Sequence, residues 1–200
     1  SLQALPPNAD AREQMLSELL IRQEPGEKIL APKQSWWYYQ KVASEVSGVT
    51  VTYSLKERND VYSYNVEEIM DLYRKHSPHV VLIASPNNQT GNSFPENAFE
   101  DLMNTAGRSV VILDEAYWGF NGQTDEHVAA LVGKYENLLV LRTFSKYYAL
   151  AGARIGFAAA GKGLSHLAKF TSRYLGFNRV SEALALAALG IGKGDEVIVP

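Results

Sequence analysis

Short apolar runs alternate along the chain with segments in which apolar residues recur every three or four positions. The apolar runs predict buried strands at residues 28–31, 49–55, 80–84, 109–113, 138–141 and 154–159. The periodic segments predict helices at residues 10–23, 35–46, 65–76, 95–107, 125–135, 163–174 and 183–189. The polar stretch 56–64 is interpreted as a loop. This alternation indicates an α/β fold with three layers, α/β/α, around a mostly parallel sheet.

Local signals mark several of the expected helix ends. Pro25 and Gly26 stop the helix before them. Asn65 with Glu68 three residues later is a capping-box pattern. Pro95 suits the first turn of the helix that it opens.

Polar residues follow three of the predicted strands directly. They are the groups Ser85 to Gly91, Asp114 to Tyr117 and Thr143 to Lys146. In open α/β sheets the carboxyl ends of the strands form the ligand-binding edge. A lysine at this edge can be desolvated until its free amine attacks a carbonyl and forms a Schiff base. Lys146 is therefore the candidate nucleophile, although a single loop lysine is more often a solvated surface charge.

The same edge offers groups that suit a bound phosphate. Thr143 and Ser145 carry hydroxyls, and Arg154 carries a planar cation that can form two hydrogen bonds to one anion.

Taken together, the three polar groups resemble the signature of fold-type I pyridoxal-phosphate enzymes, the class I/II aminotransferases. Within them, the chain is most similar to the histidinol-phosphate aminotransferase group. The family has an Asn-Pro-x-Asn-Pro-Thr-Gly loop, then Asp-Glu-Ala-Tyr, then Ser-Lys-x-x-x-Leu-Ala-Gly-x-Arg-x-Gly. This chain has all three in that order over roughly residues 24–190, but it has Ser85 for the first Asn and Gln89 for the second Pro.

The resemblance implies a role for each matching residue. Lys146 would bind pyridoxal 5'-phosphate and move a proton, and Asp114 would keep the pyridine nitrogen protonated. Asn88 and Tyr117 would bind the phenolic oxygen of the ring. Trp36 is the best match for the aromatic residue that stacks on the ring, whereas Trp37, Tyr38 and Tyr39 are interpreted as packing residues. The implied catalytic residues are Lys146, Asp114 and Tyr117, and the implied cofactor-binding residues are Trp36, Asn88, Asp114, Tyr117, Thr143, Ser145, Lys146 and Arg154.

Composition limits the other classes of function. The chain has 200 residues, of which 46% are hydrophobic and 20% charged, which is ordinary for a globular domain. A net charge of −3 gives no basic surface for nucleic acid. There is no cysteine, the four histidines lack a zinc-ligand spacing, and no apolar run approaches the about 18 residues that span a bilayer. We therefore expect a cytoplasmic protein with no metal, nucleic-acid partner or membrane.

The ends of the chain are less typical. We expect residues 1–200 to form a single cofactor-binding large domain that lacks the family's small C-terminal domain and its substrate-binding arginine. Residues 191–200, read as a possible strand-like tail, echo residues 25–32. A truncated, recombined or artificial chain would explain the echo, and so would chance.

The resemblance implies an aminotransferase that moves an amino group between an amino acid or amino-alcohol phosphate and a 2-oxo acid, and that forms a homodimer. Two alternatives stay open. One is a decarboxylase of a phosphorylated amino acid, which shares the three motifs. The other is a large-domain fragment without turnover.

Overall fold

The structure is a computed structural model, which describes residues 26–45, 47–120, 122, 126–170 and 179–190. The predicted helix at residues 10–23 and the tail at residues 191–200 lie outside these ranges.

A six-stranded sheet forms the middle of the described part of the chain, in the order β2-β1-β5-β6-β7-β8. Neighbouring strands are parallel except for β7 and β8, which are antiparallel. The mostly parallel sheet predicted from the sequence is thus confirmed. The strands are β1 (Lys28–Pro32), β2 (Val49–Tyr53), β5 (Val80–Ala84), β6 (Val110–Asp114), β7 (Leu138–Thr143) and β8 (Gly156–Ala160).

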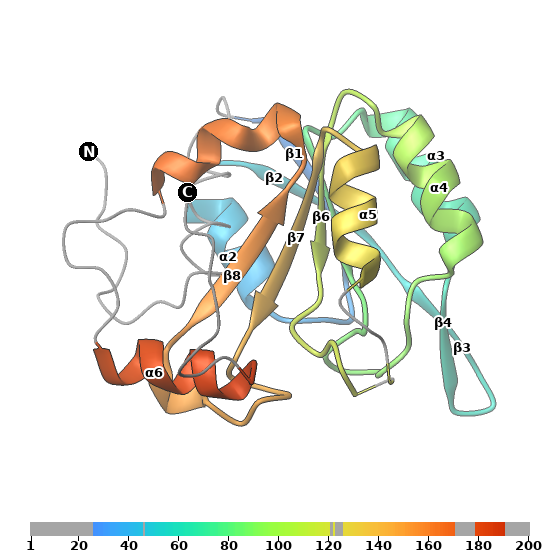
Figure 1. Ribbon diagram of the computed structural model, residues 1–200. Coiled ribbons are helices and arrows are strands. Elements are labelled where there is room, and N and C mark those ends of the chain that lie inside the picture. The colour runs from blue at the N-terminus through green and yellow to red at the C-terminus, as the bar shows by residue number, and fades with distance from the viewer. Residues whose placement is uncertain (1–25, 46, 121, 123–125, 171–178, 191–200) are drawn as a thin grey trace.

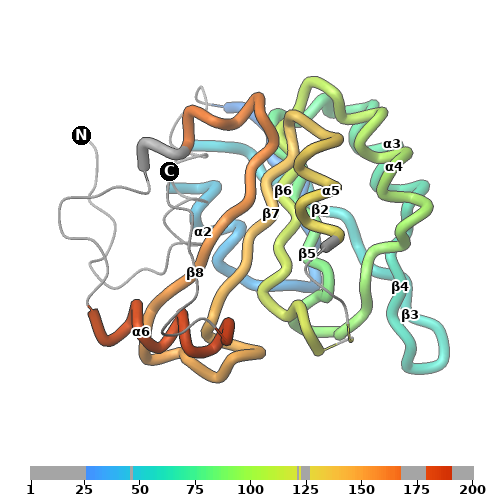
Figure 2. Tube along the Cα trace, in the orientation of Figure 1, coloured from blue at the N-terminus to red at the C-terminus, as the bar shows by residue number. Residues whose placement is uncertain are grey.

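Helices cover both faces of this sheet, which gives the three layers (Figures 1 and 2). Ile69, Leu102 and Val128, from helices α3, α4 and α5, pack against one face. Val42 of α2 and Leu164 of the 3-10 helix η2 pack against the other. The bounds are α2 (Tyr38–Glu45), α3 (Val66–His76), α4 (Glu96–Thr105), α5 (Glu126–Lys134), η1 (Ala151–Ala153), η2 (Lys162–Phe170) and α6 (Arg179–Ala188).

The central strands are buried on both faces, as their sequences require. Every residue of β5 and β7 is buried. Because side chains alternate along a strand, Leu82 faces the layer of α2 and Ile83 faces the layer of α3 and α4. Continuous apolar runs are typical of such strands, and for this reason they were visible in the sequence.

The polar stretch 56–64, interpreted as a loop, instead forms most of an antiparallel hairpin, so that prediction was wrong. Its strands are β3 (Leu55–Arg58) and β4 (Val61–Tyr64). Only the paired ends, Leu55 and Tyr64, are buried, which leaves little apolar signal in the sequence. Asn59 and Asp60 both have positive φ, 52° and 60°, as the two central residues of a type I′ hairpin turn require.

The helix predicted at residues 65–76 is confirmed as α3, which begins directly after Asn65 and ends at His76. Its capping box is not formed, because the side chain of Asn65 makes no capping bond: its Nδ2 donates to Oε2 of Glu68 at 2.9 Å, while Oε1 of Glu68 accepts the amide of Ser54 at 3.3 Å. The helix predicted at residues 163–174 is the 3-10 helix η2 as far as Phe170, and the rest of that range is not described.

None of the helices in the described ranges is long and apolar enough to cross a membrane.

Candidate active site

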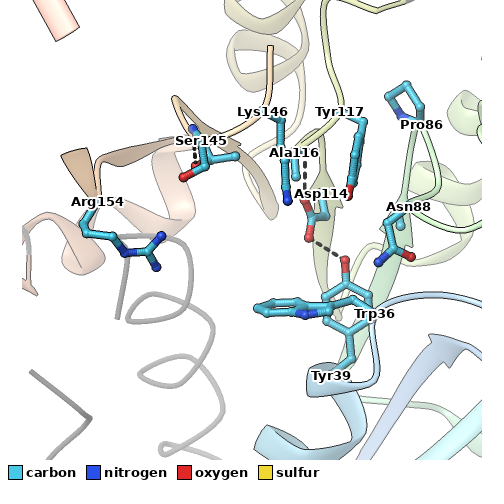
Figure 3. A pocket seen from close by; sticks show the side chains of 12 residues that line it. Trp36, Tyr39, Pro86, Asn88, Asp114, Ala116, Tyr117, Ser145, Lys146 and Arg154 are labelled. Carbon is cyan, nitrogen blue, oxygen red and sulfur yellow. Dashed lines mark hydrogen bonds between the residues drawn. The ribbon is translucent and has the colours of Figure 1, made fainter. Parts of the chain in front are cut away.

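A cavity of about 160 Å³ opens at the carboxyl ends of β5, β6 and β7 (Figure 3). All eight residues that the sequence analysis expects to bind the cofactor line it. The lining residues are Trp36, Tyr39, Ala84, Pro86, Asn88, Asp114, Ala116, Tyr117, Thr143, Ser145, Lys146 and Arg154. Parallel strands end at one edge of the sheet, and this explains why motifs far apart in sequence meet here.

The carboxylate of Asp114 lies at the end of β6 and is only 2% exposed. Its Oδ1 accepts the amide of Ala116 at 3.0 Å, and its Oδ2 accepts the phenol of Tyr39. A buried carboxylate with donors on both oxygens has a fixed orientation, and it attracts a cationic group on a ligand.

The loop after β5 is fastened to the segment that precedes Trp36. Nδ2 of the buried Asn87 donates to the carbonyl of Gln34 at 2.8 Å, and Nε2 of Gln89 donates to the carbonyl of Ser35 at 2.7 Å. The hydroxyl of Ser35 donates to Oδ1 of Asn88 at 3.3 Å. The departure from the family motif at Gln89 is therefore a structural link in this chain, where a proline could not donate a hydrogen bond.

Ser145 and Arg154 lie on the side of the cavity formed by the chain after β7 (Figure 3), and Thr143, the last residue of β7, also lines the cavity. The hydroxyl of Thr143 donates to the carbonyl of Ile155 at 3.3 Å and accepts the amide of Ser145 at 3.1 Å. Oγ of Ser145 is a buried atom with no hydrogen-bond partner among the described residues. Buried hydroxyls normally have a partner, so this one fits an oxygen of a phosphate ester, with Arg154 as the cation.

The side chain of Lys146 lies between Ser145 and Tyr117, and its amine points toward Asp114 (Figure 3). Its Nζ lies 5.5 Å from the centroid of the Tyr117 ring. The side chain is exposed, so the desolvated amine expected from the sequence is not seen. The loop that carries it is closed at its base, where the amide of Phe144 donates to the carbonyl of Ile155 at 3.0 Å.

Two groups in and beside the site were not recognised in the sequence. Tyr39 was interpreted as a packing residue, although its phenol contacts Asp114; its spacing of three residues from Trp36 places both on one side of the helix start, and this was the available signal. Glu115, which follows Asp114 but does not line the cavity, was not noted; it is 4% exposed and bonded to Arg142 and His127. No spacing rule links these three residues, because they meet only in the fold.

The sequence matches the model of a protein family described as aminotransferase class I and II over residues 12–196. It is 36% identical over 166 residues to a histidinol-phosphate aminotransferase of Ruminiclostridium cellulolyticum, covering 83% of this chain and 45% of that protein. A histidinol-phosphate aminotransferase of Chlorobaculum parvum is 38% identical over 133 residues, 66% of this chain and 36% of that one.

Among solved structures, the fold is similar to the histidinol-phosphate aminotransferase from Sinorhizobium meliloti in complex with pyridoxal-5'-phosphate. The TM-score is 0.73 at 23% identity, over 91% of this chain and 49% of that one. The chain spans about half the length of the curated relatives it matches.

Proposed function

Because the chain belongs to the family of class I and II aminotransferases, we propose that it holds pyridoxal 5'-phosphate and acts in amino-group transfer. The substrates would be an amino acid or amino-alcohol phosphate and a 2-oxo acid. The proposal depends on one geometric observation: the eight residues expected to bind the cofactor, which come from four separate segments of the sequence, line one cavity.

The cavity residues fit this cofactor by their chemistry. Asp114 offers a buried carboxylate for the pyridinium nitrogen, and Trp36 offers a flat side chain for the ring. Asn88 and Tyr117 would bind the phenolic oxygen. The hydroxyl of Ser145, which has no hydrogen-bond partner in the described part of the chain, would bind the phosphate together with Thr143 and Arg154.

When bound, pyridoxal phosphate supplies an aldehyde carbon that condenses with amines and a ring that accepts electrons from the substrate's α carbon. Lys146 would hold the cofactor covalently between reactions. After the amine of the substrate has replaced Lys146, the free amine of Lys146 would take the proton from the α carbon of the substrate. The catalytic residues of the proposal are thus Lys146, Asp114 and Tyr117.

The direct test is an absorption spectrum of the purified chain with added pyridoxal phosphate, followed by borohydride reduction and mass spectrometry of the peptides. We expect a new visible band and a reduced adduct on Lys146. An adduct on other lysines alone, or no adduct, would remove the cofactor from the proposal.

Transamination is preferred to decarboxylation because the relatives above are named aminotransferases. A coupled assay separates the two reactions, since transamination consumes a 2-oxo acid and decarboxylation releases carbon dioxide. A chain that binds the cofactor on Lys146 and does neither would be the large-domain fragment without turnover. The proposal that residues 1–200 form one cofactor-binding large domain would be tested by limited proteolysis.

We also propose that the protein is a homodimer with its cavity near the interface. Two large apolar side chains are exposed side by side next to residues of the cavity: Phe120 is 62% and Tyr147 50% exposed, and their ring centroids lie 5.6 Å apart. Trp37, which follows Trp36, is also 66% exposed. Exposed apolar groups of this size mark interaction surfaces when they lie together. Sedimentation equilibrium at high concentration should show a dimer, and a monomer alone would contradict it. A cytoplasmic location stays a prediction.

A further inference from the structure

Tyr39 lies beside the candidate acid-base machinery without belonging to any of the three motifs. It is 6% exposed, it lines the cavity, and its phenol donates a hydrogen bond to Oδ2 of Asp114. We propose that Tyr39 is a positioning residue for Asp114, which fixes the carboxylate so that it can pair with a ring nitrogen. This inference rests on the proposed function.

The hydrogen bonds of Asp114 show why one donor matters. Oδ1 is held by the amide of Ala116 at 3.0 Å, from the same turn of chain. Oδ2 is held by Tyr39, from a helix 75 residues earlier in the sequence. Without the phenol, the carboxylate would keep the local bond to Ala116 and lose this tie to a second element. Since Asp114 is 2% exposed, bulk water cannot readily replace the missing donor.

Tyr39 also links Asp114 to the residue proposed to stack on the ring. The rings of Trp36 and Tyr39 meet edge to face, with centroids 5.5 Å apart and an interplanar angle of 86°. Figure 3 shows Trp36 beside Tyr39, whose hydroxyl points to Asp114. The start of this helix therefore sets the distance between the Trp36 ring, which would stack on the face of the cofactor ring, and the Asp114 carboxylate. A fixed distance between these two groups is required to hold a flat ring in one orientation.

Packing fixes the position of this helix. Val42 and Ala43 of α2 are 1% and 0% exposed and belong to the same core cluster as Tyr39. The Tyr39 ring is therefore held by the core, while its hydroxyl reaches the cavity. Removing only the hydroxyl should leave the helix in place, so Tyr39→Phe is a clean variant.

The test compares two probes on the purified chain. One is pyridoxal phosphate, and the other is its analogue with a carbon in place of the ring nitrogen, which cannot pair with Asp114. Equilibrium binding is followed by tryptophan fluorescence, without turnover. We expect Y39F to weaken pyridoxal phosphate about tenfold, the scale of one hydrogen bond to a charged group. Binding of the analogue should stay unchanged.

The matched control is Tyr38→Phe, which removes the neighbouring phenol on the same helix, outside the cavity lining. It should leave the binding of both probes unchanged. A double-mutant cycle gives a second measurement: in the background of Asp114→Asn, the selective effect of Y39F should vanish, because the phenol acts through the carboxylate.

The outcomes separate cleanly. Equal weakening of both probes would mean that Tyr39 only supports the shape of the cavity, and it would overturn the inference. Unchanged or tighter binding of pyridoxal phosphate in Y39F would overturn it as well. A parent chain that binds pyridoxal phosphate without an adduct on Lys146 would instead contradict the proposed function. A parent that does not bind it would refute both.

Discussion

Nε of Arg142 donates a hydrogen bond to Oε2 of Glu115 at 2.8 Å, and the two side chains are 5% and 4% exposed. The other carboxylate oxygen of Glu115 lies 2.8 Å from Nε2 of His127. The guanidinium of Arg142 also lies 3.9 Å from the centroid of the Trp118 ring. Glu115 follows Asp114, and Arg142 precedes Thr143, so this buried pair joins the ends of the two strands that supply the site.

Glu115→Gln should therefore destabilise the fold strongly. Removing one partner leaves the Arg142 charge buried, which typically costs about 3 to 5 kcal/mol. Urea unfolding followed by circular dichroism measures the change. The control is Glu100→Gln, which removes an ion pair at 2.7 Å to Lys134 with both side chains more than half exposed. Equal shifts of the two midpoints would contradict the argument, because exposed pairs contribute little.

Lys146→Ala should abolish the covalent adduct with pyridoxal phosphate while leaving the fold intact. The side chain is exposed and its loop is closed by backbone hydrogen bonds, so little packing is lost. The measurement is borohydride trapping with mass spectrometry, next to a thermal unfolding curve. Lys162→Ala, at another exposed lysine, should keep the adduct. An unchanged cofactor spectrum in K146A would refute the assignment.

Asp114→Asn should keep some cofactor bound but weaken the protonation of its ring. A nearby carboxylate raises the pKa of a cationic partner, so its removal should lower the pKa of the pyridine nitrogen by roughly 1 to 3 units. Absorbance of the bound cofactor as a function of pH measures this shift. If the pH dependence matched that of the parent, Asp114 would not face the ring nitrogen.

The fold should lose stability in alkali through two buried tyrosines. Burial raises the pKa of Tyr53 well above its usual value of 10.0, and burial likewise raises the pKa of Tyr64. Below pH 10 both tyrosines are neutral in the folded and in the unfolded chain, so their contribution to stability is complete. Above pH 10 the unfolded chain ionises them while the folded protein keeps them neutral, so the free energy of unfolding falls as the pH rises. Each adds a slope of about 1.4 kcal/mol per pH unit.

The phenol of Tyr53 donates to the carbonyl of Leu82 at 3.0 Å. Tyr53→Phe should be less stable at pH 7 by about 1 kcal/mol, the net value of a typical hydrogen bond. It should also show a shallower alkaline slope in urea titrations at several pH values. A variant with the full slope would mean that other groups drive the alkaline loss.

Gly119→Ala should disturb the loop that carries Lys146, because Gly119 lies in a turn that packs against Tyr147. Gly119 has φ of +93°, and a Cβ there would lie 2.6 Å from Cγ of Tyr147, the residue after Lys146. We expect a loss of about 1 to 3 kcal/mol in stability and weaker cofactor binding. The control is Gly133→Ala on α5, where a Cβ meets no atom within 4 Å and should be neutral or stabilising. Equal effects of both changes would contradict the clash.

The sequence predicted the parts of the fold in which one residue type dominates a short run. The strands from Val80 and Leu138 are continuous apolar runs, and the polar motifs come directly after them, so their meeting at one edge followed from the topology. The antiparallel direction of β8 did not follow, because a short strand reads the same in both directions and the chain path decides. The hairpin of β3 and β4 lacked an apolar face to detect.

The residues of the site likewise differ in how readily the sequence reveals them. Motif residues such as Asn88 and Lys146 could be identified one by one, since each follows a recognisable strand. The contact of Tyr39 with Asp114 depends on where a helix docks, and helix docking is a property of the packed core. Side chains that hold other side chains in place are therefore the least visible group in a single sequence.

The antiparallel pairing of β7 and β8 bears on how the cavity assembles during folding. The bond from Thr143 to Ile155 closes a span of 12 residues, whereas the bond from Tyr39 to Asp114 closes a span of 75 residues. The longer closure costs roughly 1.6 kcal/mol more in chain entropy. We expect the side of the cavity that carries Lys146 to order early as a local hairpin, and the side that carries Trp36 to join only when the sheet is complete.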